Sequence, residues 1–125
     1  MIYTSSYSAA SRLGATKSLY HMVRISVTKP DWAEADDALP VLYPDSHMLW
    51  DYKAGRIDER EYTQRYIDEL DCCSERVVEA VRAAQERAAG KPLLLLCWCG
   101  RGKFCHRHIF AEWWENLTGE PVQEL

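Results

Sequence analysis

The stretch of sequence that decides the fold is Leu93-Leu94-Leu95-Leu96-Cys97-Trp98-Cys99-Gly100-Arg101-Gly102-Lys103-Phe104-Cys105-His106-Arg107-His108. Its first part is apolar at consecutive positions, which is typical of a strand buried on both faces of a parallel sheet. Gly100 and Gly102 interrupt that strand, and the chain then enters a helix predicted over 109–117. The segment therefore predicts a strand, a glycine-containing turn and a helix.

Further strands and helices are predicted on the N-terminal side of this segment. Branched and aromatic residues predict strands over 2–7 and 20–27. Asp58 and Glu61 form a capping pair that opens a helix, and apolar residues at four-residue spacing follow it. A second helix begins near Ser74 and stops at Gly90. We expect a three-layer α/β sandwich with a small, mostly parallel sheet and helices on both faces, formed by residues 1–125 as one domain.

Composition and charge exclude several classes of protein. The formal net charge is -4 at pH 7, so the chain lacks the broad basic surface of a general nucleic-acid-binding protein. The longest apolar run, 93–98, is too short to span a bilayer, so no membrane partner is expected. The five cysteines are odd in number and include the adjacent Cys72 and Cys73, which favours a reducing compartment over a disulfide framework. We therefore expect a cytoplasmic protein.

Cysteine, histidine and cationic side chains concentrate in residues 97–108. This segment holds three of the five cysteines, two of the four histidines and three cations, without a carboxylate. In α/β proteins, ligands bind at the carboxyl ends of strands, where helix N-termini favour anions. We therefore predict a pocket for a small anionic ligand, phosphorylated or nucleotide-like. Its predicted ligand-binding residues are Arg24, Arg101, Lys103 and Arg107.

Arg24 is included because it lies inside an otherwise apolar predicted strand. An arginine there is costly unless it is paired or reaches a cleft. One interpretation makes it a ligand clamp at the strand end, and the other places it on an edge strand open to water.

Cys105 and His106 are the predicted catalytic residues. A cysteine near a helix N-terminus, flanked by His106 and Arg107, is expected to have a lowered thiol pKa and to be activated as a nucleophile. The spacing differs from that of a phosphatase-type loop, in which an arginine follows the cysteine after six residues, because Lys103 stands at that distance from Cys97.

Three other interpretations of the same residues remain open. In the first, zinc is bound by Cys97, Cys99, Cys105 and His106 or His108, and the protein is a zinc-stabilised interaction module whose helices bind a protein partner. The one-residue gap between Cys97 and Cys99 is shorter than the usual zinc spacing. In the second, two of the three thiols form a redox pair. In the third, the cysteines only pack in the core and the charges only face solvent.

The chain resembles the domain-of-unknown-function family 488 in three motifs. These are the run Tyr62-Thr63-Gln64-Arg65-Tyr66-Ile67-Asp68-Glu69-Leu70, the triplet Cys105-His106-Arg107 after a strand that ends in cysteine, and Val23-Arg24-Ile25-Ser26 with Pro30 after it. The segments Cys97-Trp98-Cys99 and Cys105-His106 are also similar to the related family 4326 of small phage and bacterial proteins. The resemblance implies a compact α/β fold with one site at the strand ends, but no established reaction. It assigns the site to Arg24, Cys97, Cys105, His106 and Arg107.

The chain departs from the family pattern at two places. Family members commonly have an acidic residue shortly after the cysteine of the strand, where this chain has Cys99-Gly100-Arg101. The acid that commonly accompanies the Arg24 strand is also missing, since Met22 precedes Val23.

Overall fold

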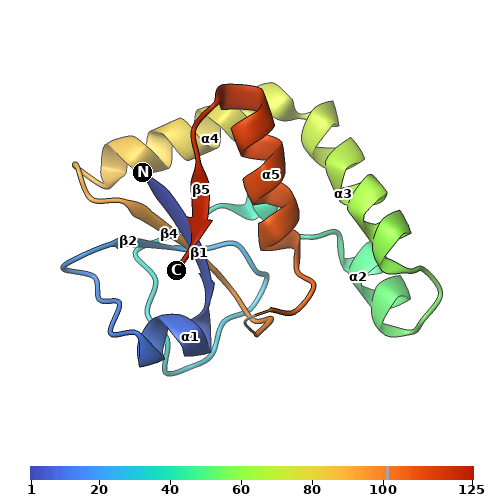
Figure 1. Cartoon of the computed structure of the whole chain (residues 1–125), viewed down its shortest axis with the longest axis horizontal. Helices are drawn as coiled ribbons and strands as arrows, with labels where there is room; N and C mark the ends of the chain where they lie inside the picture. Colours follow the sequence, from blue (N-terminus) through green and yellow to red (C-terminus); the bar gives the residue numbers. More distant parts are fainter. Residues whose placement is uncertain (101) are drawn as a thin grey trace.

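The structure, a computed structural model, describes residues 1–100 and 102–125. It is built on one five-stranded sheet with the order β3-β2-β4-β1-β5, in which neighbouring strands are parallel (Figure 1). The strands are β1 (Ile2–Ser6), β2 (His21–Arg24), β3 (Asp37–Ala38), β4 (Leu93–Cys97) and β5 (Val122–Glu124). The helices are α1 (Tyr7–Arg12), the 3-10 turn η1 (Pro40–Leu42), α2 (Ser46–Lys53), α3 (Glu59–Cys72), α4 (Ser74–Arg87) and α5 (His106–Thr118).

The apolar strand β4 lies at the centre of this sheet. All five of its residues are buried, and it pairs with β1 on one side and β2 on the other. A strand with neighbours on both edges and helices or loops on both faces has no position that tolerates exposure. The prediction of a buried parallel strand is therefore confirmed.

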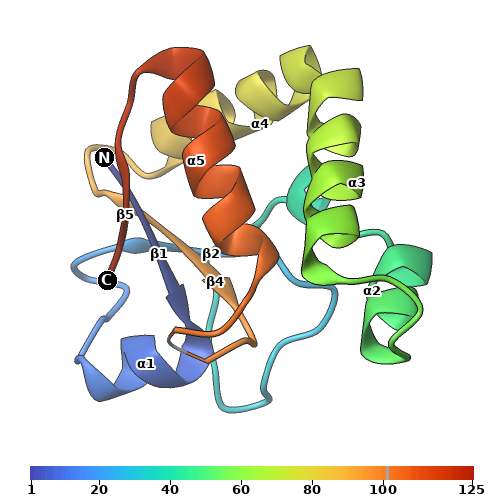
Figure 2. The same cartoon turned by 45° about the vertical axis from the view of Figure 1, so that its right-hand side comes forward.

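The sheet is covered unequally on its two faces. Leu93 and Leu95 belong to the larger core, which α3, α4 and α5 complete with residues such as Phe110. Leu94 and Leu96 face the opposite side, where the short helix α1 and neighbouring loops cover them. Figures 1 and 2 show α1 on the side of the sheet away from these three longer helices. The three-layer α/β sandwich is confirmed, with one thick and one thin outer layer.

Helix α3 forms as its capping pair and its apolar spacing predict. The Asp58 carboxylate accepts a hydrogen bond of 2.8 Å from the backbone N–H of Glu61. Tyr62, Tyr66 and Leu70 lie on one face and are buried in the core. Among the helices formed by residues 1–100 and 102–125, none is long and apolar enough to cross a membrane.

The structure differs from the sequence prediction at the strand ends and at the sheet edges. Strand β1 stops at Ser6 because the Ser6 hydroxyl accepts a hydrogen bond from Ala9 N and begins α1. Strand β2 ends at Arg24, three residues earlier than predicted. The sequence did not predict β3 and β5, which are two and three residues long and lie at opposite edges of the sheet. Edge strands this short have too few alternating positions to be recognised from residue pattern.

Candidate functional site

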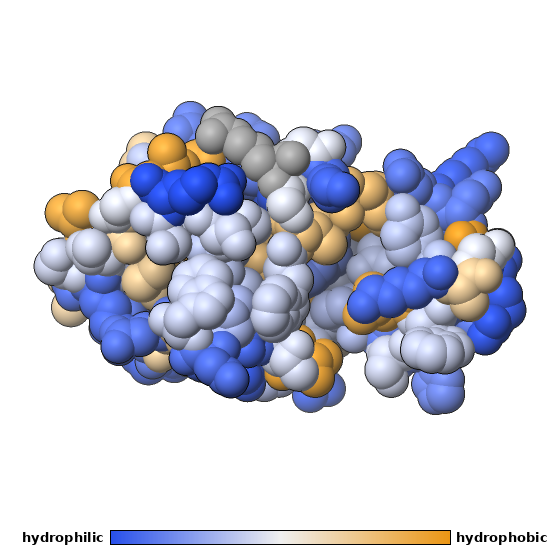
Figure 3. Space-filling view, turned by 90° about the horizontal axis from the view of Figure 1, so that it is seen from below, coloured by the Kyte–Doolittle hydropathy of each residue, from blue (hydrophilic) through white to orange (hydrophobic). Residues whose placement is uncertain are grey.

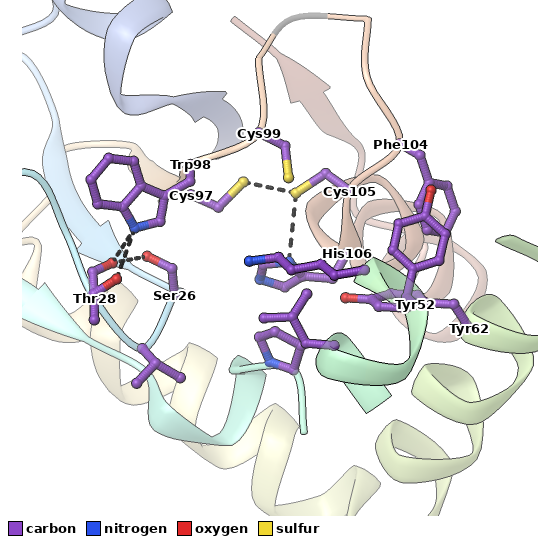
Figure 4. A pocket seen from close by; sticks show the side chains of 14 residues that line it. Ser26, Thr28, Tyr52, Tyr62, Cys97, Trp98, Cys99, Phe104, Cys105 and His106 are labelled. Atoms are coloured by element: carbon purple, nitrogen blue, oxygen red, sulfur yellow. Dashed lines mark hydrogen bonds between the residues drawn. The ribbon is translucent and has the colours of Figure 1, made fainter. Parts of the chain in front are cut away.

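A cavity of about 450 Å³ opens where β2 and β4 end and α5 begins. Figure 3 shows this side of the molecule, whose surface is hollowed near the centre, and Figure 4 shows the lining side chains. Parallel strands bring their carboxyl ends to one edge of the sheet, so the loops after β2 and β4 meet there. The lining residues are Ser26, Val27, Thr28, Pro44, Leu49, Tyr52, Lys53, Tyr62, Cys97, Trp98, Cys99, Phe104, Cys105 and His106.

Three cysteine side chains converge at one wall of this cavity. Cys97 ends β4 and Cys105 is the N-cap residue of α5, and their Sγ atoms are 2.9 Å apart. Both residues are almost fully buried, whereas Cys99 is exposed. Figure 4 shows the Cys99 sulfur beside that of Cys105. The cluster therefore has one thiol open to solvent and two thiols behind it.

The two ring nitrogens of His106 contact different partners. Nε2 lies 2.8 Å from the carbonyl oxygen of Ile25, so this nitrogen carries the proton and donates it to the carbonyl. Nδ1 is then the acceptor, and it lies 3.5 Å from Cys105 Sγ. Burial lowers the pKa of His106, so the ring is neutral and its Nδ1 lone pair faces the thiol. In this geometry the His106 imidazole can act as a general base for Cys105 or as a metal ligand.

The thiols of this cluster differ in pKa. Hydrogen bonds from the thiols of Cys105 and then Cys97 lower the pKa of Cys99 to about 2. The pKa of Cys105 is raised, because its thiol proton interacts with Cys97 and Cys99 and because the residue is buried. Negative charge is therefore favoured at Cys99 over Cys105, whose pKa is raised and not lowered as its place at the helix start predicts.

The Arg107 guanidinium lies in the interior and holds the loop that carries Cys99. It is fully buried, and it donates hydrogen bonds to the Glu124 carboxylate, to Cys97 Sγ at 3.0 Å and to the carbonyl oxygens of Cys99 and Gly100. Hydrogen bonds to Glu124 and contact with the Cys97 thiol outweigh burial and raise the pKa of Arg107. These contacts hold the loop and the C-terminal strand in place, and contact between Arg107 and a ligand stays a prediction.

The structure places Arg24 and Lys103 away from the cavity wall. Arg24 donates from Nε to the Tyr43 hydroxyl at 3.1 Å and borders a separate depression near β3. Lys103 is exposed on the loop between β4 and α5 and is not a lining residue. Arg101 lies outside the described residues. Among residues 1–100 and 102–125, the lysine or arginine that lines the cavity is Lys53 of α2.

Within the described residues, the group that could hold a metal ion contains two of the predicted cysteines and His106, one of the two histidines that the prediction left open. The ligand atoms of Cys97, Cys105 and His106 all lie within 4.8 Å of one another. His108, the other histidine of that prediction, lines a depression between α3 and α5. Residues 106 and 108 point to different sides of α5 because helical neighbours two apart do not share a face.

An aromatic wall that the sequence did not predict faces the thiols. The rings of Tyr52, Tyr62 and Phe104 contact one another with centroids 5.2–5.3 Å apart. Tyr62 was expected to be a core residue because of its helical spacing, and it is both part of the core and part of the cavity wall. No sequence pattern predicts this wall, because its three rings come from separate segments, namely α2, α3 and the loop before α5.

Trp98 ties the loop after β4 to the loop after β2. Its Nε1 donates to the carbonyl and hydroxyl oxygens of Thr28 at 2.9 and 3.0 Å, and its ring packs edge-on against Tyr7. The Tyr7 hydroxyl is 2.7 Å from Ser26 Oγ, which donates to the Thr28 carbonyl. These contacts form the polar end of the cavity, opposite the aromatic wall (Figure 4).

Comparison with known proteins identifies the family. A family model described as the Active DUF488-N3 subclade matches residues 4–117, which is nearly the whole chain. The chain belongs to the DUF488 family. The matched region contains the three motifs on which the resemblance was based, and that prediction is confirmed. No curated protein and no solved structure matches this DUF488 chain.

Proposed function

We propose that this DUF488 protein binds a small phosphorylated, nucleotide-like ligand and acts on it through its cysteine–histidine cluster. The observation that carries the proposal is the convergence of an exposed thiol, a thiol–imidazole pair and an aromatic wall on one cavity of about 450 Å³. Cavities of this size are typical of small-molecule sites.

The aromatic wall supports a ligand with a planar ring. Tyr52 and Phe104 offer ring surface toward the cavity, and every nucleobase has a face that stacks on such rings. Ser26 and Thr28 at the other end offer hydroxyl groups for polar substituents. A flat ligand with a polar edge fits both ends of the cavity.

The cavity also has features that favour an anionic group. Lys53 lines it, and the thirteen-residue helix α5 begins at His106 beside it, so the positive end of the helix dipole faces the cavity. These features support a phosphate, and Lys53 takes a role that the sequence prediction gave to Arg24, Arg101, Lys103 and Arg107.

The chemistry is assigned to thiol and imidazole groups. Cys99 is exposed and its neighbours lower its pKa, which suits a nucleophile. His106 Nδ1 is positioned to take a proton from Cys105, the residue predicted as catalytic. The description of the matching family model as an active subclade supports an enzyme rather than a purely structural domain.

Ligand binding is tested by calorimetry with a matched panel of adenosine monophosphate, adenosine, ribose 5-phosphate and inorganic phosphate. We expect the monophosphate to bind more tightly than either of its parts. Tyr52→Ala should weaken its binding about tenfold, because loss of one stacking ring costs about 1–3 kcal/mol. Trp50→Ala is the control, since Trp50 is exposed on the same helix and does not line the cavity. Equal binding by the Tyr52→Ala variant, or no binding by any compound of the panel, would contradict the proposal.

A second candidate function is a zinc-stabilised interaction module, and one observation favours it. Cys97, Cys105 and His106 offer three soft ligand atoms within 4.8 Å, and Cys99 could supply a fourth. The hydrogen bond from His106 Nε2 to a backbone carbonyl is the usual support of a zinc-bound histidine. Native mass spectrometry of the reduced protein tests this function. One zinc per chain, with a large loss of melting temperature on chelation, would support it, and a metal-free mass would remove it.

A further inference from the structure

We propose that Cys97, Cys99 and Cys105 form a thiol–disulfide exchange centre that reduces low-molecular-weight disulfides. This activity does not depend on the nucleotide-like ligand proposed above. It rests on the order of the three thiols, from an exposed one at the cavity mouth to two buried ones that contact each other.

The two buried thiols are close to bonding distance. Their sulfurs are 2.9 Å apart, and a disulfide bond is about 2.05 Å long, so a movement of less than about 1 Å joins them. Cys105 is the N-cap residue of α5 and follows the glycine-containing loop. Cys97 is the last residue of the central strand and is held by its pairing. The small movement can therefore come from the loop and the helix cap without any change in the sheet.

Neighbouring side chains supply the proton acceptor and the charge that exchange needs. His106 Nδ1 faces Cys105 Sγ at 3.5 Å, and its tautomer is set by the hydrogen bond from Nε2 to Ile25. Arg107 Nη1 donates to Cys97 Sγ at 3.0 Å, which stabilises negative charge on that sulfur. Thiolates rather than thiols attack disulfides, so His106 accepts the proton that Cys105 must lose, and Arg107 stabilises the charge that Cys97 carries when it attacks.

The exchange begins at the exposed thiol. The Cys99 thiolate attacks one sulfur of a disulfide RSSR, the S–S bond breaks, RS⁻ leaves and a mixed disulfide remains on Cys99. Cys105 then gives its proton to His106 Nδ1 and attacks the Cys99 sulfur, which releases the second RS⁻. The product of this step is a disulfide between Cys99 and Cys105.

The last step moves the disulfide to the interior. Cys97 attacks the Cys105 sulfur and expels Cys99 as a thiolate, which leaves a buried bond between Cys97 and Cys105. Across the three steps RSSR gains two electrons, and the protons of Cys97 and Cys105 end on the two released thiols. A dithiol reductant of the dithiothreitol class reverses the oxidation and returns the protein to its starting state.

The experiment treats the reduced, full-length protein with oxidised glutathione, blocks free thiols with iodoacetamide and maps the products by peptide mass spectrometry. We expect a disulfide between Cys97 and Cys105 that dithiothreitol reverses. Cys105→Ser should accumulate glutathione on Cys99, since the resolving thiol is gone. Cys99→Ser should slow formation of the buried disulfide about tenfold or more, because glutathione must then reach a buried sulfur.

The two cysteines outside the cavity provide matched controls. Cys72→Ser and Cys73→Ser should leave the rate and the product unchanged, since both residues lie at the end of α3. Glutathione on Cys72 and Cys99 alike, with no intramolecular disulfide, would overturn the proposal. Protection of all three cavity cysteines by a zinc ion that co-purifies would overturn it as well. The nucleotide panel is scored separately by calorimetry, so either proposal can fail while the other stands.

Discussion

Arg107 and Glu124 form an ion pair between the first turn of α5 and the last strand, with Nη2 and Oε2 2.8 Å apart. The guanidinium is completely buried, and the carboxylate also accepts a hydrogen bond of 2.6 Å from Thr4. Because Arg107 also holds the carbonyls of Cys99 and Gly100, this pair connects the C-terminal strand to the loop that carries the exposed thiol.

Glu124→Gln should destabilise the protein by about 3 kcal/mol, since removing one partner leaves a buried, uncompensated charge on Arg107. Urea unfolding monitored by circular dichroism measures the change. Glu115→Gln is the control, because Glu115 is exposed on α5 and should change stability by less than about 0.5 kcal/mol. Similar stabilities for both variants would show that the pair contributes little.

The same pair predicts a dependence of stability on acid pH. Burial raises the pKa of Glu124, but hydrogen bonds from Arg107 and Thr4 outweigh it and leave the pKa lowered. A carboxylate with a lowered folded pKa stabilises the native state fully above its unfolded pKa of about 4.3, and this contribution is lost as pH falls through the folded value. The stability difference between the wild-type protein and Glu124→Gln should therefore be constant from about pH 7 to 5 and shrink below about pH 4. A difference that grows on acidification contradicts this sign.

Cys99 should be alkylated at a rate that hardly changes with pH. Because its neighbours lower its pKa to about 2, its thiolate fraction is already complete in mildly acidic solution. Free cysteine, with a pKa of about 8.5, should by contrast react far more slowly at pH 6 than at pH 8. Iodoacetamide labelling followed by peptide mass spectrometry compares the two between these pH values. A Cys99 rate that rises with pH as steeply as that of free cysteine would show that the thiol is not ionised.

Tyr66→Phe should destabilise the protein by about 1.5 kcal/mol. The buried Tyr66 hydroxyl donates to the Leu42 carbonyl at 2.7 Å, and the substitution leaves that carbonyl without its partner. Tyr3→Phe is the control, since the Tyr3 hydroxyl only contacts the Met1 sulfur at the surface. Thermal unfolding of the two variants measures the difference, and equal melting temperatures would rule out the predicted contribution.

Trp98→Phe should make the buried thiols easier to alkylate. The variant keeps an aromatic ring but loses the hydrogen bonds to Thr28, which are worth about 1 kcal/mol in total, so loop opening should become about fivefold more frequent. The labelling rate of Cys97 measures this opening. Trp32→Phe serves as the control because Trp32 is exposed and lies outside the cavity. An unchanged Cys97 rate would mean that Trp98 does not hold the loop.

The sequence by itself determined the central strand and the longer helices, and it predicted where the candidate site lies. The apolar run of β4 requires burial on both faces, and the four-residue spacing of Tyr62, Tyr66 and Leu70 requires a helix with one buried face. The position of the cysteines and of His106, between a strand end and a helix start, placed them at the ligand-binding edge of a parallel sheet. These features can be predicted from the sequence because each depends on the residue spacing within a single strand or helix.

Only the tertiary structure decided which side chains meet. Cys97 contacts Cys105, and His106 rather than His108 joins them, because the loop after β4 folds back on the strand end. Arg107 turns inward because β5, an edge strand that pairs with β1, brings Glu124 to it. Contacts of this kind join residues of different elements, so they depend on strand register and helix packing, which no local spacing encodes.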